Sequence, residues 1–166
     1  MSDAPPPDEA TNAVASDPEP LYFEDYTPDF RVEGGRYEVT EAEILEFGRR
    51  FDPQPFHVDP VAAKDGPFGG LIAPGCLTFS IRQNLFNQLP VRPVLFAGLG
   101  LDTLDLPTPV RPGDVLTLEI ETHETRRSSS RPDTGIVATK QSVRNQKGEV
   151  VFSMIARMIV RARSEG

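Results

Sequence analysis

The chain has 166 residues, a formal net charge of −8, two histidines and one cysteine. This length can bury the core of one domain without disulfides or metal ions, and a single cysteine excludes an internal disulfide. The acidic balance argues against nucleic-acid binding, which needs lysine and arginine gathered on one face, and no apolar stretch approaches the roughly 20 residues of a membrane-spanning helix.

Residues 1–20 form a segment rich in proline and acidic side chains, with almost no large apolar residues. Such a composition cannot offset the entropy of ordering, so we expect a disordered tail. The segment also lacks the basic start and apolar run of a secretory signal, which favours a cytoplasmic location. Aromatic side chains enter at Leu21, so we expect one folded domain over residues 21–166.

The first predicted helix begins at Thr40. Thr40 and Glu43 match a capping box, in which the Thr40 side chain caps a backbone N–H and Glu43 reaches back to the N-cap. Apolar residues follow at helical spacing as far as Phe51, and Pro53 disfavours the helical conformation at Asp52. The helix should therefore end near Phe51 or Asp52, and a loop should follow.

The second predicted helix covers residues 75–89. A short helical turn around residues 60–64 and a glycine-rich link at residues 66–70 precede it. Its apolar residues lie nearly all round, so we expect a buried helix. Cys76 lies in its first turn, where we interpret it as a small buried apolar residue in preference to a reactive thiol.

From residue 94 onward the hydrophobic period changes toward two, which predicts four strands, at residues 94–106, 115–124, 136–145 and 149–163. Turns at residues 110–114 and 145–148 and a polar loop at residues 126–134 separate them. A further strand around residues 30–37 would complete an antiparallel sheet. Helices followed by a run of strands indicate an α+β fold.

The two histidines have different surroundings. His123 lies in a strand whose apolar residues alternate on the other face, so we predict a surface position. His57 lies between Asp52 and Asp59 in a proline-punctuated loop, a setting that suits proton transfer. Spacing alone leaves an alternative open, in which both aspartates cap helices and His57 hydrogen-bonds a backbone carbonyl.

Other kinds of site find less support in the sequence. His57 and Asp59 could supply two metal ligands, but the remaining histidine and cysteine give no ligand spacing, so we expect no metal site. Phosphate-loop and dinucleotide patterns are missing, so no nucleotide cofactor is implied. Gly75 opens a helix, where exposed N–H groups favour a developing enolate oxygen; alternatively, it only ends the loop after Pro74.

The region around His57 reads Asp52-Pro53-Gln54-Pro55-Phe56-His57-Val58-Asp59. It is followed by Phe68-Gly69-Gly70-Leu71-Ile72-Ala73, and then by Gly75 before an apolar helix. This pattern resembles the MaoC-like dehydratases, which include the (R)-specific enoyl-CoA hydratases, and the likeness covers about residues 21–162. The resemblance implies a hot-dog fold, an antiparallel sheet wrapped around a long central helix, in a homodimer joined through sheet edges.

The resemblance also implies a mechanism. Asp52 and His57 match the family's catalytic pair, which activates the water that adds to the β-carbon and supplies a proton to the α-carbon. Gly75 matches the glycine whose N–H binds the thioester oxygen. The implied substrate is a 2-enoyl- or 3-hydroxyacyl-thioester of coenzyme A, with no cofactor besides the coenzyme A of the substrate.

Four positions depart from the family's pattern, one of which is Phe51, which stands before Asp52 where a glycine is common. Gln54 replaces a usual asparagine, Pro74 stands where a histidine is often found, and Gln83 replaces the serine that some hydratases place near the catalytic acid. Two other functions therefore stay open. One is a hot-dog thioesterase, whose aspartate and histidine are spaced one residue closer, and the other is a non-catalytic acyl-CoA-binding subunit.

Overall fold

The computed structural model describes residues 17–164. Its helices are α1 (Glu41–Phe51), the short α2 (Pro55–Val58) and α3 (Gly75–Asn87), with two 3-10 turns, η1 (Phe23–Asp25) and η2 (Ala62–Asp65). Its strands are β1 (Glu19–Leu21), β2 (Arg31–Glu38), β3 (Val91–Pro93), β4 (Leu95–Asp105), β5 (Val115–Arg127), β6 (Thr134–Arg144) and β7 (Val150–Arg161). None of the helices in the described part is long and apolar enough to cross a membrane.

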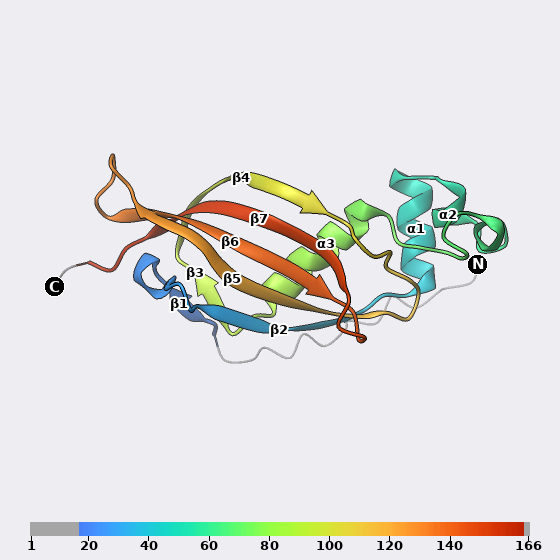
Figure 1. The fold of residues 1–166 in the computed structure, drawn as a ribbon, viewed down its shortest axis with the longest axis horizontal. Helices are drawn as coiled ribbons and strands as arrows, with labels where there is room; N and C mark the ends of the chain where they lie inside the picture. The colour runs from blue at the N-terminus through green and yellow to red at the C-terminus, as the bar shows by residue number, and fades with distance from the viewer. Residues whose placement is uncertain (1–16, 165–166) are drawn as a thin grey trace, which may run out of the picture.

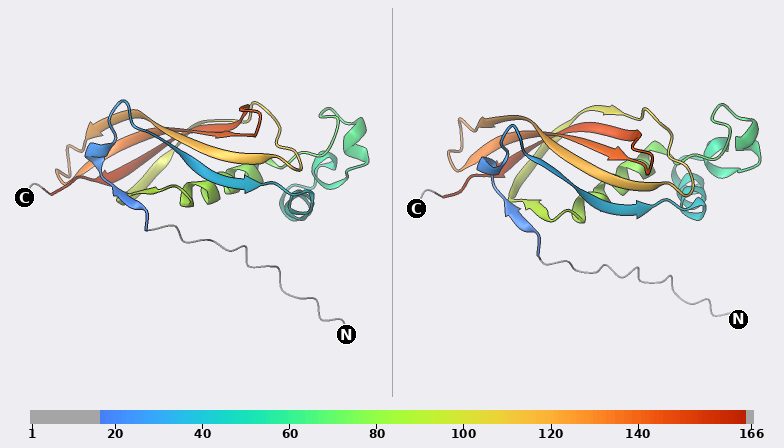
Figure 2. Two further views of the ribbon diagram at one scale, coloured as in Figure 1. Left: turned by 90° about the horizontal axis from the view of Figure 1, so that it is seen from below. Right: turned by 60° about the horizontal axis from the view of Figure 1, so that its bottom comes forward.

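The main sheet has five strands in the order β2-β5-β6-β7-β4, and every neighbouring pair is antiparallel. It curves over α3, which lies along one of its faces, while α1 and α2 lie beyond one end of the sheet (Figures 1 and 2). The edge strand β4 follows β7 with three register shifts, and Thr103 within it has a φ of +44°. The predicted α+β architecture, an antiparallel sheet around a central helix, is confirmed.

The core fills the space between α3 and the inner face of the sheet. Alternating side chains of β5 point inward, and α3 meets them with apolar residues at helical spacing. Fully burying an aliphatic side chain contributes about 2 kcal/mol, so these residues hold the helix on the sheet. Those at most 4% exposed include Leu77, Ile81, Leu85, Leu116, Leu118, Ile120, Val143, Phe152 and Met154.

The prediction that α3 is buried all round is wrong. The sheet covers one side of α3, and in the described residues the opposite side of α3 is exposed. Cys76 is among the exposed residues, so the predicted burial of its side chain is also wrong. The physical reason is that the exposed residues of α3 recur at three- and four-residue spacing and therefore share one helix face. These exposed residues are Cys76, Ser80, Gln83, Asn84 and Asn87.

The start of α1 follows the predicted capping box only in part. The Oγ1 atom of Thr40 accepts a hydrogen bond from the backbone N–H of Glu43 at 3.2 Å, as expected of an N-cap. The Glu43 carboxylate, however, accepts a hydrogen bond from the hydroxyl of Tyr37. Burial and this hydrogen bond raise the pKa of Tyr37. Glu43 therefore ties α1 to β2 and does not close the capping box.

Two short strands extend the domain beyond its predicted boundary. β1 pairs in parallel with β3, and Leu21 is buried in a second apolar cluster with Tyr26, Val137 and Val160. Glu19 and Pro20 therefore belong to the folded domain, which corrects the expected tail of residues 1–20. Residues 1–16 of that tail lie outside the described residues.

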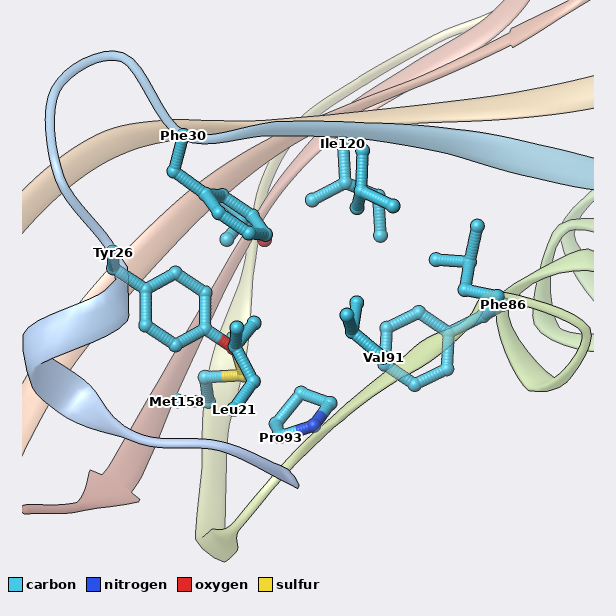
Figure 3. A pocket seen from close by; sticks show the side chains of 11 residues that line it. Leu21, Tyr26, Phe30, Phe86, Val91, Pro93, Ile120 and Met158 are labelled. Atoms are coloured by element: carbon cyan, nitrogen blue, oxygen red, sulfur yellow. The ribbon is translucent and has the colours of Figure 1, made fainter. Parts of the chain in front are cut away.

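A small apolar cavity lies beside this second cluster, between η1 and the end of α3 (Figure 3). Its volume is about 10 Å³, which is no more than one water molecule occupies. The Tyr26 hydroxyl has no hydrogen-bond partner among the described residues, and burial raises the pKa of Tyr26. The cavity is a packing gap and is too small for a ligand.

Candidate active site

The segment between α1 and η2 carries the predicted catalytic residues. Asp52 is the C-cap residue of α1, and Pro55 starts α2 at a first helical position, where proline is favoured. His57 therefore lies in a short helix and not in the predicted loop. α2 packs closely on α1 at Gly48, because a Cβ atom there would lie 2.8 Å from the carbonyl oxygen of His57. Sequence reasoning did not identify Gly48.

The structure brings Asp52 and His57 together. The Nε2 atom of His57 lies 3.5 Å from Oδ2 of Asp52, and the His57 side chain is 6% exposed while that of Asp52 is 40% exposed. The Nδ1 atom of His57 lies 2.8 Å from the carbonyl oxygen of Ile72. A carbonyl only accepts hydrogen bonds, so Nδ1 carries the hydrogen and the neutral ring keeps its lone pair on Nε2. Nε2 of His57 and Oδ2 of Asp52 are close enough to accept hydrogen bonds from the same donor or to share one proton.

Asp59 has a structural role. Its Oδ1 atom accepts hydrogen bonds from the backbone N–H groups of Val61 and Ala62, at 2.9 and 3.0 Å. This is the capping role that the alternative interpretation gave to both aspartates. The carbonyl contact of His57 also fits that interpretation, whereas the Asp52 carboxylate faces the His57 ring.

His57 opens into a pocket of about 330 Å³ at the amino end of α3. Gly75 and Thr78 of α3 line it, as does the connection between β4 and β5, from Leu106 to Val110. Phe56 and Phe68 stack edge-on beside it, with ring centroids 5.2 Å apart. His57 and Gly75 therefore share one largely apolar pocket, and Asp52 reaches it through its contact with His57.

Backbone hydrogen bonds fix the wall between His57 and α3. The N–H of Ile72 donates to the carbonyl of Phe56 at 3.0 Å, and the N–H of Ala73 donates to the carbonyl of Val110 at 2.8 Å. The segment before α3 is thus tied both to α2 and to the turn before β5. This wall holds the Ile72 carbonyl in place for His57.

Gly75 is the first residue of α3, so its N–H has no acceptor within the helix. The positive end of the helix dipole lies at the same point. A Cβ atom on Gly75 would lie 2.8 Å from the Cδ1 atom of Leu106, so the glycine lets Leu106 close over the helix start. Sequence reasoning missed Leu106 and also Thr78, although Thr78 lies on the same side of α3, three residues after Gly75.

Gln54, Pro74 and Gln83 depart from the family pattern, and within the described residues no hydrogen bond joins the side chain of any of them to His57 or Asp52. Gln54 accepts a hydrogen bond from the His57 N–H through its backbone carbonyl, at 2.8 Å. Pro74 is the N-cap of α3. Gln83 is exposed, and its side-chain oxygen accepts a hydrogen bond from Nη1 of Arg82 at 2.7 Å.

His123 lies outside the pocket. It is exposed at the irregularity of β5 between Thr122 and Glu124, so its predicted surface position is confirmed. Within residues 17–164, no three histidine, cysteine, aspartate or glutamate side chains converge in a way that could hold a metal ion.

Known proteins share this architecture. The family model of the MaoC like domain matches residues 26–145. The chain belongs to the MaoC-like domain family. The MaoC-like dehydratase from Rhodospirillum rubrum is 38% identical, with a TM-score of 0.80 over 87% of this chain and 99% of that one.

Two further proteins are similar to this chain. R-Hydratase PhaJ1 from Pseudomonas aeruginosa is 25% identical, with a TM-score of 0.62 over 86% of both chains. A UPF0336 protein from Streptomyces avermitilis is 33% identical over 78% of this chain and 89% of its own length. The hot-dog fold expected from the sequence is confirmed, and it is a fold that hydratases and dehydratases of this family use.

Proposed function

We propose that the chain catalyses the reversible hydration of a 2-enoyl-CoA to a 3-hydroxyacyl-CoA. The observation that carries this proposal is the approach of Asp52 to the free Nε2 of His57, in a pocket that the start of α3 also lines. The reaction needs no cofactor besides the coenzyme A of the substrate, and a cytoplasmic location fits it.

The residues divide the chemistry in a simple way. A water molecule between Nε2 of His57 and the Asp52 carboxylate donates a hydrogen bond to each acceptor. As its oxygen bonds to the β-carbon, one proton passes to the pair and the π electrons move onto the thioester oxygen. The N–H of Gly75 and the dipole of α3 stabilise this enolate. The pair then returns the proton to the α-carbon, which completes the 3-hydroxyacyl thioester.

The active form we propose is a homodimer joined along β4. β4 is an edge strand, and an edge with free backbone groups and apolar side chains needs cover. The β4 strand of a second copy, running antiparallel to the first β4, would pair the same residues in reverse order. Those on and just beyond β4 that are 40–55% exposed are Leu95, Phe96, Leu99, Leu101, Leu104 and Leu106. Sedimentation of the chain as a monomer at micromolar concentration would contradict this pairing.

One experiment separates hydration from the other acyl-thioester functions. The protein is incubated with crotonyl-CoA and with longer 2-enoyl-CoAs, while the conjugated enoyl absorbance and free thiol are followed. Loss of absorbance without thiol supports the hydratase. Release of free thiol would indicate a thioesterase, and binding without either change would indicate a non-catalytic acyl-CoA-binding subunit.

A further inference from the structure

Arg82 is a charged side chain in the core that the proposed reaction does not use. It lies on α3, is 5% exposed and has no carboxylate partner within residues 17–164. Burial lowers the pKa of Arg82 to about 10, so the guanidinium still carries its charge at neutral pH. A buried charge without a counter-ion weakens the fold, and such departures are expected where binding or catalysis uses the group.

The hydrogen bonds of the Arg82 guanidinium are incomplete. Its Nη2 atom donates to the side-chain oxygen of Gln141, which is buried on β6, and its Nη1 atom donates to the side-chain oxygen of Gln83 at 2.7 Å. Its Nε atom has no hydrogen-bond partner among the described residues. Both acceptors are neutral amides, and the exposed Gln83 can turn into solvent. The guanidinium therefore has donors left for an anion, which accepts stronger hydrogen bonds than an amide does.

Arg82 lies one helical turn beyond the pocket that holds His57. Gly75 and Thr78 line this pocket from α3. Gly75, Thr78 and Arg82 follow one another at three- and four-residue spacing, so they share one side of the helix. Thr78 is 2% exposed, so the pocket reaches the covered side of α3. At about 1.5 Å per residue, Arg82 lies roughly 6 Å along the helix from Thr78 and roughly 10 Å from Gly75.

The side chains along this stretch of α3 are largely apolar. Phe79 packs against Phe152 of β7 with ring centroids 6.0 Å apart, and the central guanidinium carbon of Arg82 lies 5.1 Å from the centroid of the Phe86 ring. An acyl chain that starts at Gly75 and follows α3 thus meets apolar groups first and a positive charge at its end. With C–C bonds of about 1.5 Å, an extended chain of roughly eight carbons covers this length.

We propose that the pocket selects a 2-enoyl thioester whose acyl chain ends in a carboxylate, and that Arg82 binds this carboxylate. The inference rests on the proposed function and deepens it by naming the substrate class. A guanidinium suits this task because its N–H donors match the two oxygens of a carboxylate. The ionised chain end supplies the counter-ion that Arg82 lacks and takes the place of the Gln83 amide. A neutral chain end leaves the buried charge unpaired, which gives the pocket its selectivity.

The test compares two substrates that differ only at the far end of the acyl chain. One is the mono-CoA thioester of 2-octenedioic acid, and the other is the same thioester with the distal carboxylate converted to a primary amide. We expect the wild type to hydrate the acid with a kcat/KM about tenfold or more above that of the amide, because hydrogen bonds between charged groups are the stronger ones. Equal values, or a preference for the amide, would overturn the proposal.

Variants of Arg82 assign the preference to this side chain. Arg82→Met/Gln141→Leu removes the buried charge together with its hydrogen-bond partner, and the preference for the acid should disappear or reverse, since the carboxylate then meets an apolar wall. Arg82→Lys keeps the charge but not the fork of donors, so it should lower the preference several-fold, and it serves if the double variant misfolds. Arg36→Ala removes an exposed arginine from the edge strand β2 and should keep the full preference. A preference that persists without Arg82 would overturn its role.

Binding of suberyl-CoA, the saturated analogue of the acid substrate, separates this inference from the proposed function. Calorimetry on the wild type compares its affinity with that of its distal amide. Suberyl-CoA that binds about tenfold more tightly than the amide, in a protein that hydrates no enoyl-CoA, would refute the hydratase and retain the carboxylate site. Hydration of the acid and amide substrates with equal kcat/KM would retain the hydratase and refute the site. Failure to bind suberyl-CoA would also refute the site.

Discussion

The Nδ1 atom of His57 lies 2.8 Å from the carbonyl oxygen of Ile72. Ile72 belongs to the segment that leads directly into Gly75 and α3, and its own N–H donates to Phe56 beside His57. The same few residues thus set which nitrogen of His57 is protonated and where the start of α3 lies. The proposed acid-base pair and the proposed thioester-oxygen site are therefore held by one piece of backbone.

The first prediction concerns the acid-base pair. Asp52→Asn keeps the shape of the side chain but removes the base, and His57→Gln removes the imidazole. Each change should lower kcat for the best enoyl-CoA by roughly a hundredfold or more, because proton transfer loses one of its two groups. The double variant should be little worse than either single variant, since groups that act as a unit give non-additive losses.

His123→Ala is the matched control for this prediction, because His123 is exposed on β5. It should leave turnover almost unchanged. If Asp52→Asn and His57→Gln both fold and keep near wild-type hydration, the two residues are structural and the proposed mechanism is wrong.

The second prediction separates two roles of Gly75. One is the proposed donation of its backbone N–H to the thioester oxygen, and the other is the room that its missing side chain leaves for Leu106. Leu106→Ala first clears the atom that a Cβ on Gly75 would meet. In this background, Gly75→Ala retains the N–H and should stay active. Gly75→Pro removes the N–H and should lower kcat by about a hundredfold or more, because one oxyanion donor is lost.

Proline suits this test because it is favoured at the first position of a helix, where the N–H has no helical acceptor. Pro74 already has an extended ψ of 144°, which a following proline requires. The steady-state kinetics of the two variants decide the matter. Equal activity of the alanine and proline forms would mean that Gly75 only makes room for Leu106.

The third prediction concerns a buried charge. Arg82 is 5% exposed, donates a hydrogen bond to Gln141, and has no carboxylate partner among the described residues. Burial lowers the pKa of Arg82 to about 10 from 12.5. The folded state therefore disfavours the charged form of Arg82. At neutral pH this lowers the free energy of unfolding by roughly 3 kcal/mol, and the loss diminishes only as the pH rises above the pKa of the folded state.

A double-mutant cycle measures this effect. Gln141→Leu alone should destabilise the protein by about 2 kcal/mol, since it leaves Nη2 of the buried guanidinium without its acceptor. The double variant Arg82→Met/Gln141→Leu should have a free energy of unfolding equal to that of the wild type or up to about 1 kcal/mol higher, because the buried charge and its hydrogen-bond partner are removed together. Urea unfolding at pH 7 and one protein concentration provides the comparison. A double variant that is less stable than Gln141→Leu would contradict the prediction.

The fourth prediction concerns the small strand β1. Leu21→Ala should lower the free energy of unfolding by about 2 kcal/mol, because it opens a gap in the cluster around Tyr26 and Val160. Glu19→Ala, in the same strand but exposed, should change it by less than about 0.5 kcal/mol. Thermal unfolding of both variants is the measurement. Equal midpoints would show that β1 adds nothing to the fold.

Sequence patterns predict the elements whose signals are local. The Thr40 cap marks the start of α1, and alternation marks β5, β6 and β7 to within a few residues. β1 and β3 lack such a signal, because each has three residues including a proline and each is held by the other. The exposed face of α3 does have a local signal in the sequence, because residues 76, 80, 83 and 87 recur at helical spacing. The many apolar residues around these positions hide this signal, and the sequence therefore predicts a fully buried helix.

The candidate site divides in the same way. Asp52 and His57 are five residues apart in one proline-rich segment, so their proximity follows from the sequence. The contacts made by Gly48, Ile72 and Leu106 join segments that meet only after the sheet and α3 have packed. No local pattern reports such contacts, and those positions become visible only in the folded chain.

The irregular course of β4 bears on aggregation. A straight apolar edge accepts strands from any other chain and can extend into fibrils. β4 pairs with β7 through three register shifts, and the positive φ of Thr103 bends its backbone. Regular hydrogen bonding along the edge is therefore limited to short stretches, and Asp102 and Asp105 place charge among its leucines. A newly folded, unpaired chain thus carries an edge that disfavours open-ended stacking.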